Sequence, residues 1–349
     1  MKVVVSGGLG FIGSRLARAY ALRGDDVHVL DALHPQVHAS DRALHEVAQW
    51  ARVTLGDVRD AHAWEHVLAD AELVLHMAAE TGTGQSMDEI ARYTDVNVTG
   101  TAIMLEAIAR AGCVRTIFLP SSRAVYGEGT YRCELHGLVY PTARIIDAMR
   151  VGAFEVRCAQ CDRAVTPVPV PESWEPRPVS VYATTKLAQE HLVMQHGAAR
   201  GIDVRIARYQ NVYGPGQALG NPYTGVLMIF AQQLLAGTEL NIYEDGAIAR
   251  DFVYIDDVVD ATLAIVDAKM NPGITNVGTG IATTLLDVVE RFASALGRAV
   301  PHRISGDFRA GDIRHAAADV TRLRALGFTP RTAMRDGLAA VLDAVAQGA

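Results

Sequence analysis

Residues 2–13 have the sequence KVVVSGGLGFIG, a short apolar run followed at once by the pattern G-x-x-G-x-x-G. After a strand, the first glycine permits a tight turn, the second lets the backbone approach a pyrophosphate, and the third permits close helix packing. An amphipathic stretch over Phe11–Leu22 follows, and the N-terminus of such a helix presents unpaired N–H groups to an anion. This order predicts a dinucleotide site that includes Gly7, Gly10, Phe11, Ile12 and Gly13.

The second apolar run, Asp26–Asp31, ends in an acid about 20 residues beyond the glycines, where a carboxylate accepts hydrogen bonds from the adenosine ribose. Such a carboxylate repels a 2'-phosphate, so Asp31 favours NAD over NADP, and only the nearby His34 weakens this preference. A glycine pattern alone also occurs in ordinary tight turns. The strand, the helix and the acid together favour the dinucleotide interpretation.

The first half of the chain repeats this alternation of strand and helix. Short apolar runs are expected to be strands at Lys2–Ser6, Asp26–Asp31, Ala51–Leu55, Leu73–His76, Thr116–Leu119 and Asp203–Ala207. Helix-period stretches lie between them at Phe11–Leu22, Ser86–Arg110 and Val181–His196. The pattern predicts a doubly wound α/β fold of the Rossmann type, with a parallel sheet covered by helices on both faces.

The alternation fails in two later regions. Residues 128–178 are interrupted by prolines and cysteines and are interpreted as an insertion. Beyond Asn211 short strands are expected at Leu240–Tyr243 and Asp251–Tyr254, and helices at Val258–Ala268, Leu285–Leu296 and Met334–Ala346. We predict a dinucleotide-binding domain from residues 1–127 and 179–210, and a smaller substrate-binding lobe mainly from residues 211–349, with segments that return to the first domain.

Composition narrows the class of protein. The formal net charge is −7 without a basic block, which disfavours a nucleic-acid partner and requires local cations for any anionic ligand. No apolar run approaches the roughly 20 residues that cross a bilayer. The first residues lack a secretory pattern, and the four cysteines are too few for a disulfide scaffold. A cytoplasmic protein without a membrane partner is expected.

A tyrosine and a lysine supply the candidate chemistry. Tyr182 and Lys186 lie four apart in a helical stretch, so they share a face. The ammonium and an oxidised nicotinamide would lower the tyrosine pKa from about 10 and make the phenolate a general base for a hydroxyl. Such a pair alone is common on helix surfaces. The catalytic interpretation is strengthened by Ser121 and Ser122, which follow the apolar run Thr116–Leu119. We expect the Ser122 hydroxyl to form a hydrogen bond with the reacting oxygen and Ser121 to cap the strand.

These residues belong to a longer series of blocks. The blocks are GGLGFIG (7–13), Asp31, GDVRD (56–60), HMAAE (76–80), SSRAVYG (121–127), YATTK (182–186), RYQNVYGPGQ (208–217) and RDFVYIDDV (250–258). In this order they resemble the extended short-chain dehydrogenase/reductase family of nucleotide-sugar epimerases and dehydratases, over nearly the whole chain.

The resemblance implies roles for further residues. The expected cofactor contacts are Asp57, Val58, Ala78, Ala79, Thr81, Asn97 and Tyr209, beside the glycines, Asp31, Tyr182 and Lys186. The expected contacts to a nucleotide-diphosphate sugar are Ser122, Arg123, Asn211, Arg250, Arg309 and Asp312. A homodimer through the helices at residues 86–110 and 181–200 is also implied.

The reaction follows from what the chain lacks. Family dehydratases carry an Asp-Glu pair after the catalytic hydroxyl residue, whereas this chain has Arg123 and Ala124, which disfavours dehydration and decarboxylation. What remains is 4-epimerisation: oxidation at carbon 4 by NAD with Tyr182 as base, rotation of the keto sugar, and return of the hydride. Arg123 departs from the small residue usual in epimerases and leaves the exact sugar open.

Three further blocks bear on the substrate. YGEGTYRC (126–133), GQALGNPYTG (216–225) and AGDIRH (310–315) look most like the branch that acts on dTDP-L-rhamnose, so a dTDP-deoxysugar is expected first and a UDP-hexose second. A sugar 4-ketoreductase with exchangeable NADPH is the main alternative, which Asp31 disfavours. The other is a silent NAD-sensing module whose cysteine-rich insertion contacts a protein or nucleic acid, which intact Tyr182 and Lys186 disfavour.

The insertion contains a candidate metal site. Cys133 and His136 are followed by Cys158 and Cys161, two ligand pairs at knuckle spacing that fit a tetrahedral structural zinc. Four protein ligands would leave no open position, so the metal would take no part in catalysis. An unrelated Cys-x-x-Cys and a redox pair are the alternatives, and Cys113 is expected to be a buried small hydrophobe.

Overall fold

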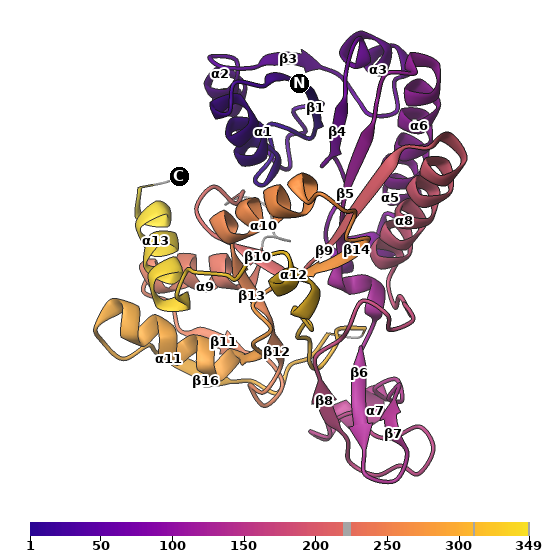
Figure 1. Cartoon of the computed structure of the whole chain (residues 1–349). Coiled ribbons are helices and arrows are strands. Elements are labelled where there is room, and N and C mark those ends of the chain that lie inside the picture. The colour runs from indigo at the N-terminus through magenta and orange to yellow at the C-terminus, as the bar shows by residue number, and fades with distance from the viewer. Residues whose placement is uncertain (219–224, 310, 348–349) are drawn as a thin grey trace.

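Seven parallel strands form the central sheet of the computed structural model, which describes residues 1–218, 225–309 and 311–347 (Figure 1). Their order across the sheet is β3-β2-β1-β4-β5-β9-β14. The strands are β1 (Lys2–Ser6), β2 (Asp26–Asp31), β3 (Arg52–Leu55), β4 (Leu73–His76), β5 (Thr116–Ser122), β9 (Asp203–Tyr209) and β14 (Ile274–Val277). The order reverses between β1 and β4, which is where open α/β sheets bind ligands.

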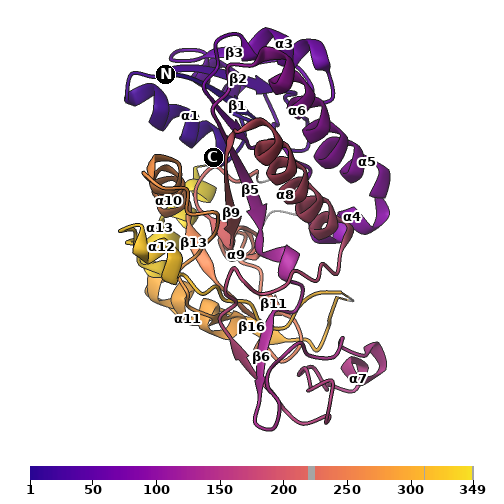
Figure 2. The ribbon, with the colours of Figure 1, turned by 45° about the vertical axis from the view of Figure 1, so that its right-hand side comes forward.

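Alternate side chains of each strand enter different cores. On β1, Val3 and Val5 pack in one core and Val4 in the other, and all three are fully buried. The first core contains α1 (Gly13–Leu22) and α10 (Ile255–Asp267), and the second contains α3 (Ala61–Leu68), α6 (Gly100–Ala111) and α8 (Val181–Arg200). Helices therefore cover both faces of the sheet, as Figure 2 shows, and the predicted doubly wound fold is confirmed.

The structure differs from the sequence prediction in several elements. The stretch at residues 86–110 is not one helix but α4 (Thr83–Asp88), α5 (Ile90–Thr94), a π-helical turn (Asp95–Thr99) and α6. Glu89 breaks it, since its backbone dihedrals of −111° and 47° lie outside the helical region. The strand β14 was not predicted, and β5 and β9 run further than expected. A short α2 (Arg42–Val47) lies between β2 and β3.

Residues 128–178, called the insertion from here on, contain more regular structure than predicted. The antiparallel strands β6 (Thr130–Cys133), β7 (Gly137–Val139) and β8 (Thr166–Val168) form a small sheet with β6 in the middle, and α7 (Ile146–Arg150) follows β7. Its core holds Tyr131, Cys133, Val139, Val156 and Cys158. The insertion projects from the carboxyl end of the main sheet in both ribbon views (Figures 1 and 2).

Residues 211–347, called the C-terminal lobe, have a core of their own that includes Tyr213, Phe230, Phe252, Phe292 and Leu338. The helices in this part of the chain are α9 (Val226–Leu235), α10, α11 (Leu285–Leu296), α12 (Thr321–Ala325) and α13 (Met334–Ala346). The short strands are β10 (Asn211–Tyr213), β11 (Leu240–Ile242), β12 (Ala249–Arg250), β13 (Phe252–Tyr254), β15 (Thr283–Thr284) and β16 (His302–Ile304). Helices α10 and α12 pack on the main sheet, and β14 pairs with β9 at its edge.

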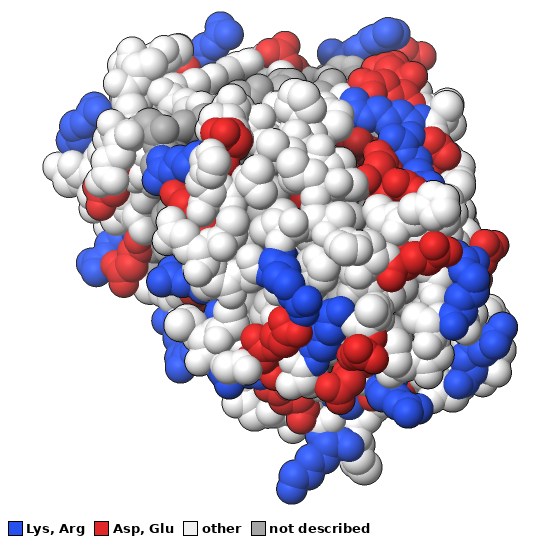
Figure 3. All heavy atoms as spheres, turned by 90° about the horizontal axis from the view of Figure 1, so that it is seen from above, with Lys and Arg blue, Asp and Glu red and all other residues white. Residues whose placement is uncertain are grey.

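Positive and negative side chains are interspersed on the face of the molecule seen from above (Figure 3). That face therefore presents charge pairs and not one extended area of a single sign. None of the helices described is both long enough and apolar enough to span a membrane.

Candidate active site and metal centre

A cavity of about 640 Å³ lies at the carboxyl ends of the central strands. Its walls include residues that follow β1, β2, β3 and β4, and residues at the ends of β5 and β9. Most of the candidate cofactor residues line this cavity, namely Gly7, Gly10, Phe11, Ile12, Gly13, Asp31, Asp57, Val58, Ala78, Ala79, Thr81, Tyr182, Lys186 and Tyr209. Asn97 does not line it.

The glycines form a cradle that larger residues would fill. Gly7 has a φ of +67°, and a Cβ atom there would lie 2.7 Å from the backbone nitrogen of Ala78. A Cβ atom on Gly13 would lie 2.1 Å from the carbonyl oxygen of Gly7, so α1 can begin this close to the turn only with glycine. Helix α1 has no side-chain cap at Ile12. The residues therefore fit a pyrophosphate held by backbone N–H groups.

Asp31 is fixed at the cavity wall by the backbone. Its Oδ2 accepts a hydrogen bond from the N–H of Leu9 at 3.0 Å, and its Oδ1 accepts one from the N–H of Leu33 at 2.8 Å. His34 and His38 also line the cavity, and His38 Nε2 lies 3.7 Å from Asp31 Oδ1. Only His34 was considered from the sequence, because His38 lies in a loop without a recognisable pattern.

Asn97 supports the cavity wall from behind. Its side chain is fully buried, accepts from the N–H of Glu80 at 2.8 Å, and donates to the Glu80 carbonyl at 3.1 Å and to Thr185 Oγ1 at 3.0 Å. It therefore links the π-helical turn to α8 and to the chain after β4.

Ser122, Tyr182 and Lys186 line the same cavity. Helix α8 begins one residue before Tyr182, where the Ser180 hydroxyl accepts from the N–H of Ala183 at 3.2 Å, and the Tyr182 N–H donates to Ser86 Oγ at 3.0 Å. These bonds orient the first turn of the helix that carries the tyrosine and the lysine.

The pKa of Tyr182 is set by opposing influences of the protein. Burial raises this pKa above its ordinary value, and the Ser122 hydroxyl and the Arg123 cation lower it. Lys186 is itself desolvated, which lowers its pKa to about 7. Arg123 is therefore a positive group favouring the phenolate that the sequence did not indicate, while the expected influence of an oxidised nicotinamide remains a prediction.

Ser121 and Ser122 have different partners. The Ser121 hydroxyl donates to Glu190 on α8, whose carboxylate also receives two hydrogen bonds from Arg208, at 2.7 and 2.9 Å. The Ser122 hydroxyl accepts from the N–H of Ala124 at 3.2 Å and begins a 3₁₀ turn at Arg123–Tyr126. Ser121 lines the cavity with its hydroxyl bonded to the buried Glu190–Arg208 ion pair, whereas the Ser122 hydroxyl interacts with Tyr182.

The candidate substrate residues are bonded to one another. Arg123 Nε donates to Asn211 Oδ1 at 2.8 Å, and Arg250 Nη2 lies 2.7 Å from Asp312 Oδ1. Burial and the neighbouring Arg250 lower the pKa of Arg123 to about 10. Arg309 is exposed and its guanidinium lies 5.3 Å from the ring centroid of Tyr243. Of this group only Ser122 lines the cavity.

Several lining residues were not found from the sequence. Among them are Glu80 and Arg92, which form an ion pair at 2.8 Å, and Arg59, which pairs with Asp57 at 2.7 Å and with Asp95 at 2.6 Å. Arg59 belongs to the GDVRD block and could have been chosen from the sequence, but no sequence pattern indicates its ion pair with Asp95. His76, in the HMAAE block, is fully buried behind the site, and burial lowers its pKa to about 3.

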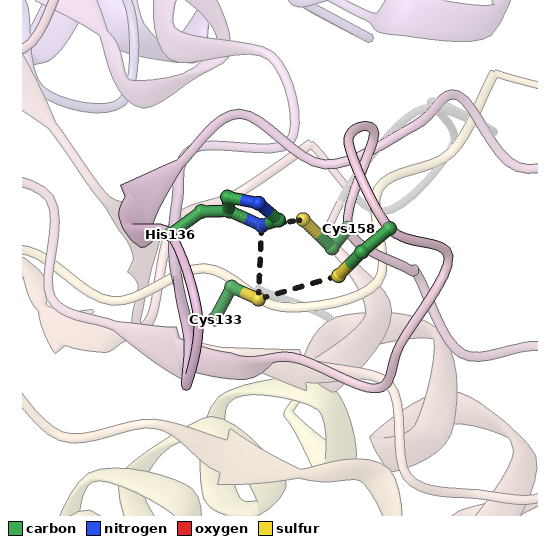
Figure 4. Close-up of side chains that lie close together, drawn as sticks. Cys133, His136 and Cys158 are labelled. Carbon is green, nitrogen blue, oxygen red and sulfur yellow. Dashed lines mark hydrogen bonds between the residues drawn. The ribbon is translucent and has the colours of Figure 1, made fainter.

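The four candidate metal ligands come together in the insertion (Figure 4). Their ligand atoms all lie within 4.8 Å of one another. Cys133 Sγ is 3.6 Å from His136 Nδ1 and 3.7 Å from Cys161 Sγ, and Cys158 Sγ is 3.5 Å from His136 Nδ1. Burial opposes ionisation of Cys133, but N–H groups of Leu135 and His136 lower its pKa to about 6. Cys113 lies elsewhere, with its Sγ 3.3 Å from the Leu68 carbonyl oxygen.

The chain is similar to known proteins over almost its whole length. A family model described as the NAD dependent epimerase/dehydratase family matches residues 3–278. The chain is 41% identical to dTDP-L-rhamnose 4-epimerase of Burkholderia thailandensis, over 99% of this chain and 95% of the relative. It is 30% identical to UDP-glucose 4-epimerase of Mycolicibacterium smegmatis, over 98% of each.

A solved structure extends the comparison to the fold. UDP-glucose 4-epimerase of Thermus thermophilus in complex with NAD has a TM-score of 0.80 and 27% identity, over 100% of both chains. The part of the GQALGNPYTG block at residues 219–224, and Ala310 of AGDIRH, lie outside the described residues.

Proposed function

The chain belongs to the NAD-dependent epimerase/dehydratase family, and we propose that it is an NAD-dependent nucleotide-sugar 4-epimerase. One observation carries the proposal: Ser122, Tyr182 and Lys186 line the same cavity as the glycine cradle. NAD supplies the hydride acceptor and donor when it is bound there. The sugar would be oxidised at carbon 4 and reduced from its opposite face, so no net oxidation occurs.

Each catalytic side chain has a proposed task. Tyr182 takes the proton of the carbon 4 hydroxyl, and Ser122 shares the hydrogen bond to that oxygen. Arg123 supplies positive charge that favours the phenolate, because burial of the phenol otherwise opposes its ionisation. Lys186, which lines the same cavity, and the oxidised nicotinamide are proposed to add to this charge. Arg123 and Ala124 offer no carboxylate next to Ser122, which disfavours dehydration.

We propose a dTDP-deoxysugar such as dTDP-L-rhamnose as substrate, with a UDP-hexose second. The 41% identity to dTDP-L-rhamnose 4-epimerase supports the first choice, and the relative named UDP-glucose 4-epimerase at 30% supports the second. Asn211, Arg250 and Arg309 are the proposed contacts to the nucleotide diphosphate, and Asp312 is the proposed contact near its ribose. Arginine is suited to this task because its planar fork matches phosphate oxygens.

The test is incubation of the purified protein with a panel of dTDP- and UDP-sugars without added cofactor, followed by NMR of the products. We expect dTDP-L-rhamnose to interconvert with its carbon 4 epimer while enzyme-bound NAD is conserved. Absence of turnover across the panel would remove the proposal. Stoichiometric consumption of NADPH with a 4-keto sugar would instead identify a ketoreductase, and the glycine cradle and Tyr182 serve that reaction equally.

We further propose that Cys133, His136, Cys158 and Cys161 bind one structural zinc ion. Bonds of about 2.3 Å to sulfur and about 2.1 Å to nitrogen, arranged tetrahedrally, place neighbouring ligand atoms roughly 3.5–3.8 Å apart. The separations of 3.5, 3.6 and 3.7 Å among these atoms fall in that range. Four protein ligands close the coordination sphere, so the proposed ion stabilises the insertion and takes no part in catalysis.

Elemental analysis tests the zinc proposal. We expect one zinc per chain in the wild type and in Cys113→Ser, and little in Cys158→Ser, with a lower melting temperature only for the last variant. A metal-free wild type, or full zinc content in Cys158→Ser, would contradict the assignment.

The dimer also remains a proposal. Helices α4, α5 and α8 pack together, and Met87, Ile90 and Val179 at this side of the molecule are each more than half exposed. Apolar side chains at such positions favour a partner surface over solvent. Light scattering should give twice the chain mass for the wild type and less for the double variant Met87→Glu, Ile90→Glu.

A further inference from the structure

A buried charged side chain of the insertion contacts the C-terminal lobe directly. Arg144 lies between β7 and α7, and its side chain is 5% exposed. Its Nη1 is 2.6 Å from Glu244 Oε1, and its Nη2 donates to the backbone carbonyl of Asp312. Its Nε lies 3.5 Å from Glu128 Oε1. A single guanidinium thus joins the insertion to two separate segments of the lobe.

A second arginine completes the cluster from the side of the lobe. Arg314 is fully buried, and its Nη1 donates to the other oxygen of Glu244 at 2.7 Å. Its Nε donates to Glu155 Oε1 at 2.9 Å and its backbone N–H to Glu128 Oε2 at 2.9 Å. Glu244, only 1% exposed, therefore bridges the two arginines, while Glu128 and Glu155 come from the insertion.

The cluster ends at the proposed substrate contacts. Arg144 holds the carbonyl group of Asp312, and Arg250 pairs with the carboxylate of the same residue at 2.7 Å. Arg250 also donates to the carbonyl oxygen of Ile313 at 2.8 Å. Asp312 and Arg250 both act electrostatically on Arg123, the residue after Ser122. Contacts therefore run from the insertion to Arg250 and Asp312, whose charges act on the residue next to Ser122.

These contacts act on a segment outside regular secondary structure. Residues 311–313 belong to no helix or strand, and the Asp312 carboxylate is held by Arg250 and by the N–H of Ile313, so contacts from Arg144 contribute to where it lies. A buried ion pair that loses one partner leaves an uncompensated charge, which the surrounding chain must move to hydrate. Loss of Arg144 would leave the buried Glu244 with one arginine in place of two and would free the carbonyl of Asp312.

We propose that the insertion positions the substrate-binding pair Arg250 and Asp312 through Arg144. Arg144 is then a positioning residue for the nucleotide sugar, although it lies outside the cavity and outside the four-ligand metal cluster. The inference rests on the proposed function only where turnover is the readout.

Substitution of Arg144 tests the proposal in the full-length protein. In Arg144→Met we expect the KM for the nucleotide sugar to rise about tenfold while kcat stays within about twofold, because uniform binding is lost and the reacting groups are untouched. NAD content and zinc content should stay at the wild-type level. Arg144→Lys, which keeps the charge but loses the fork, should show a smaller rise in KM.

The matched control is Arg150→Met in the same insertion, whose ion pair with Asp147 is exposed and which should leave KM unchanged. A KM for Arg144→Met within about twofold of the wild type would overturn the proposal, as would a loss confined to kcat. Should Arg144→Met fail to fold, Arg144→Lys decides, and an unchanged KM in that variant counts against the proposal.

Calorimetric titration of wild type and Arg144→Met with dTDP and UDP separates this inference from the proposed function. Weaker nucleotide binding in the variant supports positioning by Arg144, whatever the result of the sugar panel. Absence of turnover across that panel would remove only the epimerase proposal. Equal nucleotide affinity of the two proteins would overturn the positioning role of Arg144. The epimerase proposal would still stand if the wild type is active. If neither nucleotide binds the wild type, both proposals fail.

Discussion

The cofactor side and the substrate side of the site are built differently. The cofactor side is centred on backbone at the ends of parallel strands, where Gly7 and Gly13 leave space that a Cβ atom would fill, and charged residues such as Asp31 line its walls. On the substrate side, charged and polar side chains far apart in the sequence are bonded to one another, as in the pairs Arg123 with Asn211 and Arg250 with Asp312.

The difference concerns what each ligand must displace. A pyrophosphate at the cradle does not have to displace a side-chain cap, because helix α1 has none. A sugar nucleotide that binds Arg250 must exchange an existing ion pair for phosphate oxygens, so part of its binding free energy is offset. Variants on the first side should therefore affect both ligands, and variants on the second side only the sugar nucleotide.

The largest effect is expected from Gly7→Ala. The added Cβ atom would collide with the backbone of Ala78 at 2.7 Å, so the cradle closes and we expect NAD content and activity to be lost together. The measurement is NAD released on denaturation per mole of protein. Gly24→Ala is the control, because Gly24 also has a positive φ, +84°, but faces open space. Retention of NAD by Gly7→Ala would contradict the cradle.

Tyr182→Phe should separate chemistry from binding. Removal of the phenol hydroxyl should lower kcat by about 10²–10⁴-fold, the usual contribution of a general acid or base, with NAD content unchanged. Product NMR at saturating sugar nucleotide measures the rate. Tyr140→Phe, whose hydroxyl bonds Glu175 in the insertion, should retain full activity. Equal rates for the two variants would refute the role of Tyr182.

Arg250→Met should act on the substrate side alone. The loss of a charge-assisted contact to phosphate is worth about 1.5–3 kcal/mol, so KM should rise roughly 10- to 100-fold with NAD content preserved. Asp312, left without its partner, is 38% exposed and can be hydrated. Arg303→Met, at an exposed position on β16, is the control. Loss of NAD from Arg250→Met would break the distinction between the two sides.

The smallest effect is expected from Arg123→Met, in the dependence of kcat on pH. The phenolate of Tyr182 forms as pH rises, and the Arg123 cation lowers the pKa of that phenol. Removal of the cation therefore raises the Tyr182 pKa, and the rising limb of the rate profile should move to higher pH. A profile of kcat between about pH 6 and pH 10 measures the shift, with Ala124→Ser as control. If kcat rises over the same pH range in the variant and the wild type, Arg123 does not act on the pKa of Tyr182.

Local patterns predicted most of the fold. Strands such as β1 and β4 are continuous apolar runs buried on both faces, so their sequence is sufficient. β14 was missed because two of its four residues are polar. Thr275 and Asn276 are fully buried there, and the Asn276 amide donates to the carbonyls of Val170 and Asp319, distant segments that no local pattern indicates.

In the site, too, local sequence patterns could be predicted and contacts between distant segments could not. The glycine pattern and the spacing of Tyr182 and Lys186 are local, so the sequence located residues that line one cavity. The burial of Tyr182 and Lys186, which raises the pKa of the phenol and lowers that of the ammonium, was not predicted, because burial depends on tertiary packing. The contacts of Arg144 could not be predicted, since they join residues 100 and 168 positions apart.

The late position of β14 in the chain affects how the protein folds during synthesis. β9 ends at Tyr209, but its outer neighbour begins only at Ile274, after α9 and α10 have been made. Until then a nascent chain carries an open sheet edge, whose unpaired N–H and carbonyl groups can recruit a strand from another molecule. We expect products truncated between these strands to aggregate, and chaperone capture to be greatest in that window of translation.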